Sequence, residues 1–385
     1  MKDNGILNFM KQYSMIFFLI IIIAFFQVST GGTFLSPVNV TNVVLQNSHI
    51  LILAIGMLMV IVLGHIDLSI GSVAAFVGAI SAILMITHEV NPFLVVMLSL
   101  LIGALIGAWQ GLWVAYMKIP AFIVTLAGML IFRGLTIVVL GGRTISNFPD
   151  AFRSLSSGFI ADPIGGDDLN LTALILGMVV TVLLAAGLLI ARKRRENHGF
   201  EVASISVATL QIIVLAVIVM LFSYTLASHA GVPNVLLVLG VLIFLYHFVT
   251  TRMKIGRYLY AIGGNEKAAS LSGIKTKAVT FWTFVNMGVL AALSGLVFSA
   301  RLNASTAAAG DLFELNAIAA CFIGGASASG GVGKVKGAIM GGFIMAVINN
   351  GMSLLGIGVD WQQAIMGMIL LMAVALDVVN KKKLA

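Results

Sequence analysis

The feature that most constrains this chain is a succession of long apolar segments. Twelve occur along its 385 residues, at 15–30, 47–64, 67–87, 93–116, 119–140, 169–191, 204–227, 233–250, 279–300, 315–329, 337–356 and 362–379. A helix needs about 20 mostly apolar residues to cross a bilayer, and apolarity all round a helix is typical of buried or lipid-facing positions. We predict an all-α, polytopic membrane helix bundle of about 10–12 transmembrane helices, with the short Ala- and Gly-rich segment 315–329 broken or re-entrant.

Composition excludes the soluble classes of protein. Hydrophobic residues make up 60% of the chain and charged residues 9%, whereas a soluble domain has about 25% charged residues. A cytosolic enzyme, a disordered chain and a coiled coil are therefore excluded. The net charge of +8 is assigned to membrane topology and not to nucleic acid, and the lone Cys321 permits no internal disulfide and no cysteine-based metal site.

The distribution of Lys and Arg predicts the topology. With the N-terminus in the cytoplasm and the sides alternating, Arg143, Arg153 and Arg301 are external, Arg133 lies within a span, and the remaining 18 of the 22 Lys and Arg residues are cytoplasmic. These 18 include Lys2 and Lys11 at the N-terminus and 381–383 at the C-terminus. This asymmetry obeys the positive-inside rule, so both termini are predicted to be cytoplasmic. Removing one pair of spans would keep that parity.

The glycine-rich stretch 324–335 invites comparison with a phosphate-binding loop. A Walker A loop needs Gly five positions before Gly333 and Ser or Thr after Lys334, where this chain has Ala328 and Val335. We interpret the stretch as a turn between closely packed helices. No ATPase activity and no cofactor are expected in this chain, and any ATP and Mg²⁺ would be held by a partner subunit.

Two ionisable residues, Asp67 and Arg133, lie at or within apolar segments. Charges inside a membrane are costly and mark transport pathways by tendency. The structural alternatives are that Asp67 caps the following helix, with Ser69 and Ser72 satisfying neighbouring backbone groups, and that Arg133 bridges to a carboxylate. We favour the structural interpretation, and two such groups are few for an ion relay.

The segment 252–278 is a predicted cytoplasmic loop with a helix of its own. Gly263-Gly264-Asn265 is a turn signal, Asn265 can N-cap a helix with Glu266 in its first turn, and Gly273 can end it. The helix continues through Ala268, Ala269 and Leu271. A short helix with a small-residue face suits a groove on a partner protein, and the alternative is a solvated positive loop that only orients the protein.

Small residues recur at fourth positions in two apolar segments, Gly103 with Gly107 and Gly337 with Gly341. Such residues let helices approach closely. We expect them to serve helix packing, which could include a face for a second copy of the chain.

Four stretches together resemble one family. They are the segment around Asp67, 120–127, 256–274, and 314–320 continuing through Gly333. They resemble, and follow in the same order as, those of the membrane permease of bacterial ABC importers for monosaccharides, the ribose/xylose/galactose branch, and look closest to xylose and multiple-sugar permeases. The resemblance makes 1–385 a single permease domain, with residues 155–230 as an insert carrying two extra spans.

The resemblance implies a multi-pass protein of the bacterial cytoplasmic (inner) membrane, in contact with the lipid bilayer. Two permease copies would form the path, an ATP-binding subunit would dock beneath them, and an extracytoplasmic binding protein would deliver the sugar. The segment 252–278 would then be the coupling loop. The residues it assigns to ATPase coupling are Arg257, Gly263, Gly264, Asn265, Glu266, Ala268, Ala269, Leu271 and Gly273.

The same resemblance leaves Asp67, Arg133, Glu314 and Asn316 as pathway or structural residues within the membrane. The family commonly has Asp where this chain has Asn316, so that charge is not essential here, or Glu314 substitutes for it. We do not assign Asn316 as a sugar ligand.

The alternative function is a stand-alone secondary or facilitative transporter of small polar solutes. It would need a polar site at mid-membrane, usually with inverted repeats, and the sequence has no convincing repeat. A membrane enzyme would need clustered acid, base or metal-binding residues, and none are apparent. The identity of the sugar lies largely in the external binding protein.

Overall fold

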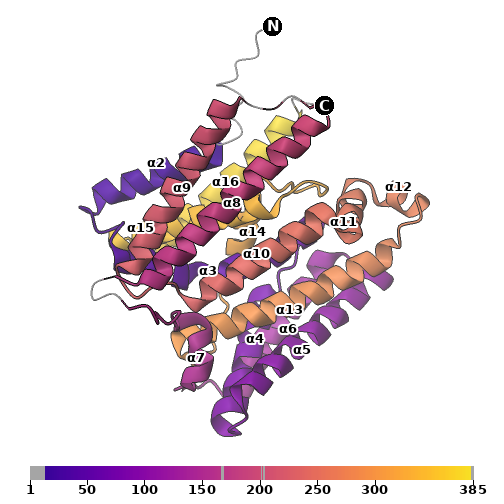
Figure 1. Ribbon diagram of the computed structural model, residues 1–385. Coiled ribbons are helices and arrows are strands. Elements are labelled where there is room, and N and C mark those ends of the chain that lie inside the picture. Colours follow the sequence, from indigo (N-terminus) through magenta and orange to yellow (C-terminus); the bar gives the residue numbers. More distant parts are fainter. Residues whose placement is uncertain (1–13, 166–168, 201, 203, 383–385) are drawn as a thin grey trace. The chain divides into compact units, whose positions relative to one another are not determined.

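The computed structural model describes residues 14–165, 169–200, 202 and 204–382 (Figure 1). Lys2, Lys11 and Lys383, which entered the topology prediction, lie outside the described residues, as do the two chain ends. The helices are α2 (Ser14–Ser29), α3 (Pro37–Val62), α4 (Ile70–Ala82), α5 (Pro92–Gly111), α6 (Ala121–Leu140), α7 (Asp150–Ser157), α8 (Leu171–Asn197), α9 (Ile205–Ala227), α10 (Asn234–Arg252), α11 (Lys254–Gly264), α12 (Glu266–Leu271), α13 (Thr276–Leu302), α14 (Phe313–Ile323), α15 (Val335–Leu354) and α16 (Val359–Lys382), with π-helical turns at Ile83–Thr87 and Leu112–Tyr116 and two strands, β1 (Ile145–Ser146) and β2 (Ala304–Ser305).

Within the described residues, nine helices are long and apolar enough to cross a membrane, and α2, α14 and α16 contain shorter apolar stretches. Each of the twelve apolar segments contains one of these helices, which confirms the predicted helical membrane fold. Several boundaries differ, among them the following two. The second segment begins at Pro37 because proline suits the first helical turn, and the segment 315–329 is a short helix, α14, followed by a turn.

The chain forms two compact units. The first comprises the described residues up to Phe34, Val43–Ser157 and those from Val235 onward. In it α13 packs against α4 and α5, α4 packs against α6, and α14 packs against α15 (Figure 1). Helix α3 supplies much of the core, since 83% of its most apolar window is buried.

Glycines set the closest crossings in the first unit. A Cβ at Gly103 of α5 would lie 2.4 Å from the Gly288 carbonyl oxygen of α13, and one at Gly288 would lie 2.1 Å from the oxygen of Gly103. A Cβ at Gly341 of α15 would lie 2.0 Å from the Ala320 oxygen of α14. The predicted close packing is therefore present within one chain, and these positions are not free to form a face for a second copy.

A two-residue antiparallel ladder joins distant parts of the first unit. Strand β1 pairs with β2, with Ile145 opposite Ser305. Close by in the chain, Phe148 and Phe152 belong to a buried cluster with Leu296 of α13. This cluster attaches α7 to the end of α13.

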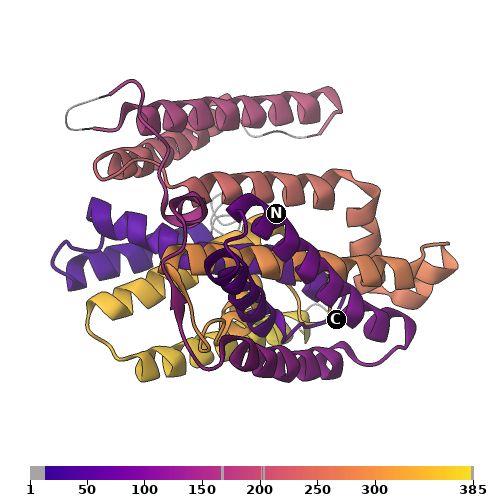
Figure 2. The same cartoon turned by 90° about the horizontal axis from the view of Figure 1, so that it is seen from below.

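The second unit comprises Leu35–Asn42 and Gly158–Asn234. Its helices α8 and α9 lie side by side (Figure 2), and a Cβ at Gly177 of α8 would lie 2.1 Å from the Ser223 hydroxyl of α9. Only 11% of the most apolar window of α8 is buried, and none of that of α9. Apart from the faces through which they contact each other, these two spans present apolar surface suited to lipid. The unit covers most of the predicted insert, 155–230.

Candidate functional site

Two breaks in the helical structure bring polar groups together. The first is the irregular segment between α3 and α4. In it the buried Asp67 carboxylate accepts the Ser69 backbone N–H at 2.9 Å and the Ser69 hydroxyl at 2.6 Å, and Gln110 of α5 donates to that hydroxyl at 2.7 Å. The N-cap of α4 is Ser69, whose side chain makes no capping bond. Asp67 therefore stabilises the turn ahead of α4. The sequence interpretation had Asp67 capping the helix, with Ser69 and Ser72 satisfying neighbouring backbone groups.

The second break precedes α14, and Arg133 of α6 reaches into it. Its guanidinium donates to the carbonyl oxygens of Ala309 at 2.7 Å and Ala307 at 3.4 Å, and lies 3.7 Å from the Asp311 carboxylate. Irregular backbone at membrane depth needs such partners. Arg133 thus both bridges to a carboxylate and satisfies the freed carbonyl groups.

The two breaks touch each other through glycines. A Cβ at Gly71, in the first turn of α4, would lie 2.2 Å from the Gly310 oxygen and 2.5 Å from the Glu314 carboxylate. Glu314 is buried, with 8% of its surface exposed. Asp67, Arg133 and Glu314, which the sequence singled out separately, therefore belong to one polar region of the fold, beside the middle of α6.

The predicted coupling loop contains the predicted helix. Asn265 has an extended backbone, and its side-chain oxygen accepts the Ala268 N–H at 3.0 Å. Glu266 lies in the first turn of α12, and Gly273 ends the segment with φ of +83°. The N-cap and the helix are confirmed. The predicted turn Gly263-Gly264-Asn265 is a break at Asn265 alone, because Gly263 and Gly264 end α11, a helix that the sequence analysis did not predict.

The start of this loop is attached to the core by backbone contacts. A Cβ at Gly263 would lie 1.7 Å from the Val62 carbonyl oxygen at the end of α3, and the Gly331 N–H donates to the same oxygen at 2.9 Å. The Tyr260 hydroxyl donates to the Gly333 oxygen at 2.7 Å. Burial raises the pKa of Tyr260, so its phenol remains a donor at neutral pH. The glycine-rich stretch is thus the turn that receives α11, and its packing role fits the sequence interpretation.

The exposed side of α12 carries a large apolar residue. Leu271 exposes 91% of its surface, whereas Ala269 on the same helix is buried at 5%. Arg257, Gly264, Glu266 and Ala268 are exposed as well. Helix α12 is therefore packed on one side and carries an exposed apolar side chain at its C-terminal end.

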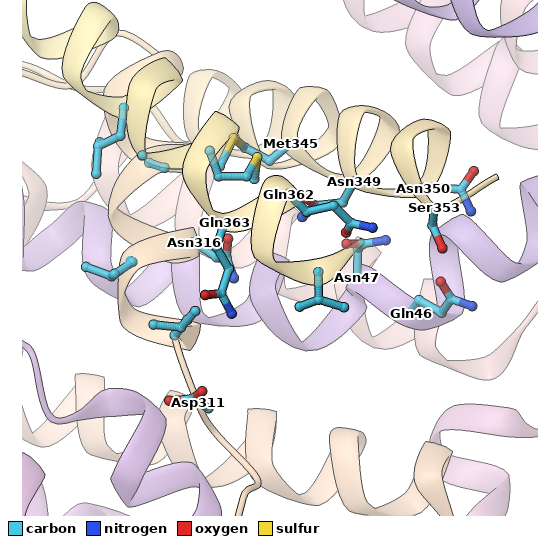
Figure 3. A pocket seen from close by; sticks show the side chains of 17 residues that line it. Gln46, Asn47, Asp311, Asn316, Met345, Asn349, Asn350, Ser353, Gln362 and Gln363 are labelled. Carbon is cyan, nitrogen blue, oxygen red and sulfur yellow. The ribbon is translucent and has the colours of Figure 1, made fainter. Parts of the chain in front are cut away.

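A hollow of about 480 Å³ opens among α3, α14, α15 and α16 (Figure 3). We call it the amide pocket. Its polar lining is Gln46, Asn47, Asp311, Asn316, Asn349, Asn350, Ser353, Gln362 and Gln363. Of these, the sequence analysis considered only Asn316. The missed signal is the set of amides within apolar segments, since uncharged polar residues in spans also need partners.

The comparisons with known proteins agree over nearly the whole chain. A family described as branched-chain amino acid transport system / permease component matches residues 39–374. The xylose transport system permease protein XylH of Haemophilus influenzae is 40% identical over 97% of this chain and 98% of its own, and that of Escherichia coli K12 is 38% identical over 97% and 93%. The ribose import permease protein RbsC of Haemophilus influenzae is 32% identical over 93% and 90%. No solved structure matches the chain.

A permease of this kind works with an ATPase and a substrate-binding protein. The fold, with its apolar helices, and the matches agree on a multi-pass protein of the inner membrane. The chain therefore belongs to this permease family, as a helical transport component of an ABC importer and not an enzyme.

Proposed function

We propose that this chain is the membrane-spanning subunit of an ATP-driven importer of a monosaccharide, with a pentose such as xylose as the first substrate to test. The observation that carries the proposal is similarity over nearly full length to permeases named for xylose and for ribose. The proposal includes a second copy of the chain, cytoplasmic termini and a sugar-binding protein on the opposite side of the membrane.

Coupling to the ATPase is assigned to α12. The support is its form: Asn265 fixes the start of the helix, Ala269 packs inward, and Leu271 is free to enter a groove on the ATPase. Burying one leucine side chain is worth about 1.5–3 kcal/mol, which is enough to make Leu271 an anchor of the interface.

The function is tested by reconstituting the chain in liposomes with and without its ATPase and binding protein, following labelled D-xylose and D-ribose. Uptake of either sugar that requires ATP and both partners is expected. Uptake by the chain alone without ATP would establish the stand-alone transporter instead.

The coupling role is tested by Leu271→Ser, which should sharply reduce the ATPase that co-purifies with the chain and abolish uptake. The matched control is Leu302→Ser, because Leu302 is also an exposed leucine (42%) but lies at the far end of α13. If both variants retain the ATPase equally, α12 is not the docking element.

A further inference from the structure

The amide pocket differs in chemistry from the exposed surfaces of α8 and α9. On α8 and α9 the exposed large side chains include Val182, Leu183 and Leu221, as lipid contact requires. The pocket instead gathers amides from α3 and from the three consecutive helices α14, α15 and α16. A face of this kind is poorly matched to lipid tails, so its occupant is water, a polar solute or protein.

The amides of the pocket differ in whether they are already hydrogen-bonded within the protein. Asn47 donates to the Val43 oxygen of its own helix at 2.8 Å, and Gln362 donates to the Ile357 oxygen at 2.8 Å. In the part of the chain that the structure describes, by contrast, no hydrogen bond involves the side chains of Asn316 and Asn349. Both point into the hollow in Figure 3.

The lining selects by hydrogen bonding and not by charge. An amide offers one acceptor oxygen and two donor N–H groups, and a sugar hydroxyl can both donate and accept. Asp311 is the single ionisable residue of the lining, and it faces Arg133. The volume of about 480 Å³ lies in the range of roughly 300–1,000 Å³ that is usual for small-molecule sites.

A second, smaller hollow is lined by some of the same residues. It has a volume of about 180 Å³, shares Asn47, Asn316 and Asn349 with the amide pocket, and is also lined by His49 and Phe313. The rings of His49 and Phe313 lie 4.5 Å apart, and both residues are buried. The same three amides therefore line both hollows.

On these grounds, and resting on the proposed function, we propose that the amide pocket is a binding station for a neutral polyhydroxylated solute on its way through the permease. Asn316 and Asn349 supply its hydrogen bonds. This gives Asn316 a ligand role that the sequence analysis did not assign.

The native cysteine allows a direct test in the complete reconstituted complex. Cys321 is fully buried, so a membrane-impermeant, charged thiol reagent should label only cysteines that are introduced at water-accessible positions. Asn316→Cys and Ser353→Cys should be labelled, and saturating D-xylose should slow the labelling at position 316 roughly fivefold. Leu105→Cys is the control, because Leu105 of α5 is 61% exposed on an apolar face and should remain unlabelled with or without sugar.

Transport supplies the second readout. Since the external binding protein sets the sugar concentration for half-maximal uptake, the maximal rate is measured. Asn316→Leu and Asn349→Leu should each lower it roughly fivefold, the effect of about 1 kcal/mol per lost hydrogen bond, while the ATPase still co-purifies. Asn197→Leu, at an exposed position on α8 outside the pocket, should leave it unchanged.

The outcomes separate this inference from the proposed function. Absence of sugar uptake by the wild-type complex would overturn the proposed function. Normal wild-type uptake that is unaffected by both leucine variants, with labelling insensitive to sugar, would overturn only the binding station. Cross-linking of Asn316→Cys to a second copy of the chain, together with labelling that is insensitive to sugar, would show that the pocket is a packed subunit interface and would also overturn the binding station.

Discussion

At the scale of single residues, Gly263 and Gly264 are adjacent in α11 but have opposite surroundings. A Cβ at Gly263 would lie 1.7 Å from the Val62 oxygen and 2.6 Å from the Gly331 nitrogen. A Cβ at Gly264 would have no atom within 4 Å. Because the atoms near Gly263 are backbone, they cannot rotate away.

We therefore expect Gly263→Ala to destabilise the detergent-purified chain by about 1–3 kcal/mol, as overpacking does, and to weaken uptake because α11 is displaced. Gly264→Ala should be neutral or slightly stabilising, since alanine favours helix. Thermal unfolding of the two variants measures the difference. Equal melting temperatures would show that α11 does not pack against α3 and the glycine-rich turn as described.

Asp162 makes the stability of the second unit depend on pH. Its carboxylate accepts the N–H groups of Leu171 at 2.7 Å, Thr172 at 3.3 Å and Gly165 at 3.4 Å, and the Thr172 hydroxyl at 2.8 Å. Desolvation alone would raise its pKa, but these hydrogen bonds to the charged form outweigh it and lower the pKa of Asp162.

A lowered pKa in the folded state means that Asp162 stabilises the start of α8 fully above its unfolded pKa of about 3.9. The contribution is lost as the pH falls through the lower folded value. Asp162→Asn should therefore lower the melting temperature at pH 6, and the gap to wild type should shrink as the pH approaches 3. Thr172→Val should reproduce part of the loss at pH 6. A gap that is constant with pH would rule out this role of the carboxylate.

At the scale of elements, α12 depends on its cap because it has only one and a half turns. Removing an N-cap side chain costs about 1 kcal/mol, and a helix this short has little else to hold it. Asn265→Ala should thus reduce ATPase co-purification and uptake severalfold. Asn265→Asp is the matched control, since its carboxylate can accept the same Ala268 N–H and should retain activity. Loss of activity in both variants would point to direct contact by the amide and not to capping.

The sequence predicted α12 because capping is local: Asn265, Glu266 and Gly273 act within a few residues of one another. Helix α11 was missed because Gly263 and Gly264 signal a turn, and the reason that they are helical is tertiary. Gly263 must approach the Val62 oxygen, while Leu259 and Ile262 are buried beneath the helix. Propensity is overridden there by packing.

The amide pocket was beyond prediction for a related reason. Each contributing helix carries only one to three of the pocket's polar side chains. In the sequence, such a side chain is an isolated polar residue in an apolar segment. Asn47 and Asn349 become neighbours of one cavity only through the packing of α3 and α15. The long apolar segments, by contrast, were predictable because membrane thickness constrains each one separately.

At the scale of the whole molecule, the longer segment of the second unit, Gly158–Asn234, has its two ends side by side. Phe159 forms a β-bridge with Pro233, the Ile160 N–H donates to the Val232 oxygen at 2.9 Å, and the Asn234 N–H donates to the Gly158 oxygen at 2.9 Å. Helices α8 and α9 both lie entirely between these points. Their excision removes two spans, so the flanking segments keep the same sides of the membrane.

We expect that deleting 160–232 and joining Phe159 to Pro233 through two glycines will leave a chain that inserts and purifies as a monodisperse protein. The reason is that the first unit has buried clusters of its own, at the end of α13 and between α2 and α15. Size-exclusion chromatography and protease protection of tags at both termini measure folding and topology. A control deletion of 205–227 alone removes a single span, and should place the C-terminal tag on the opposite side or cause aggregation. If the double-span deletion aggregates and the chain refolds only when α8 and α9 are restored, then the second unit is part of the core and not an accessory to it.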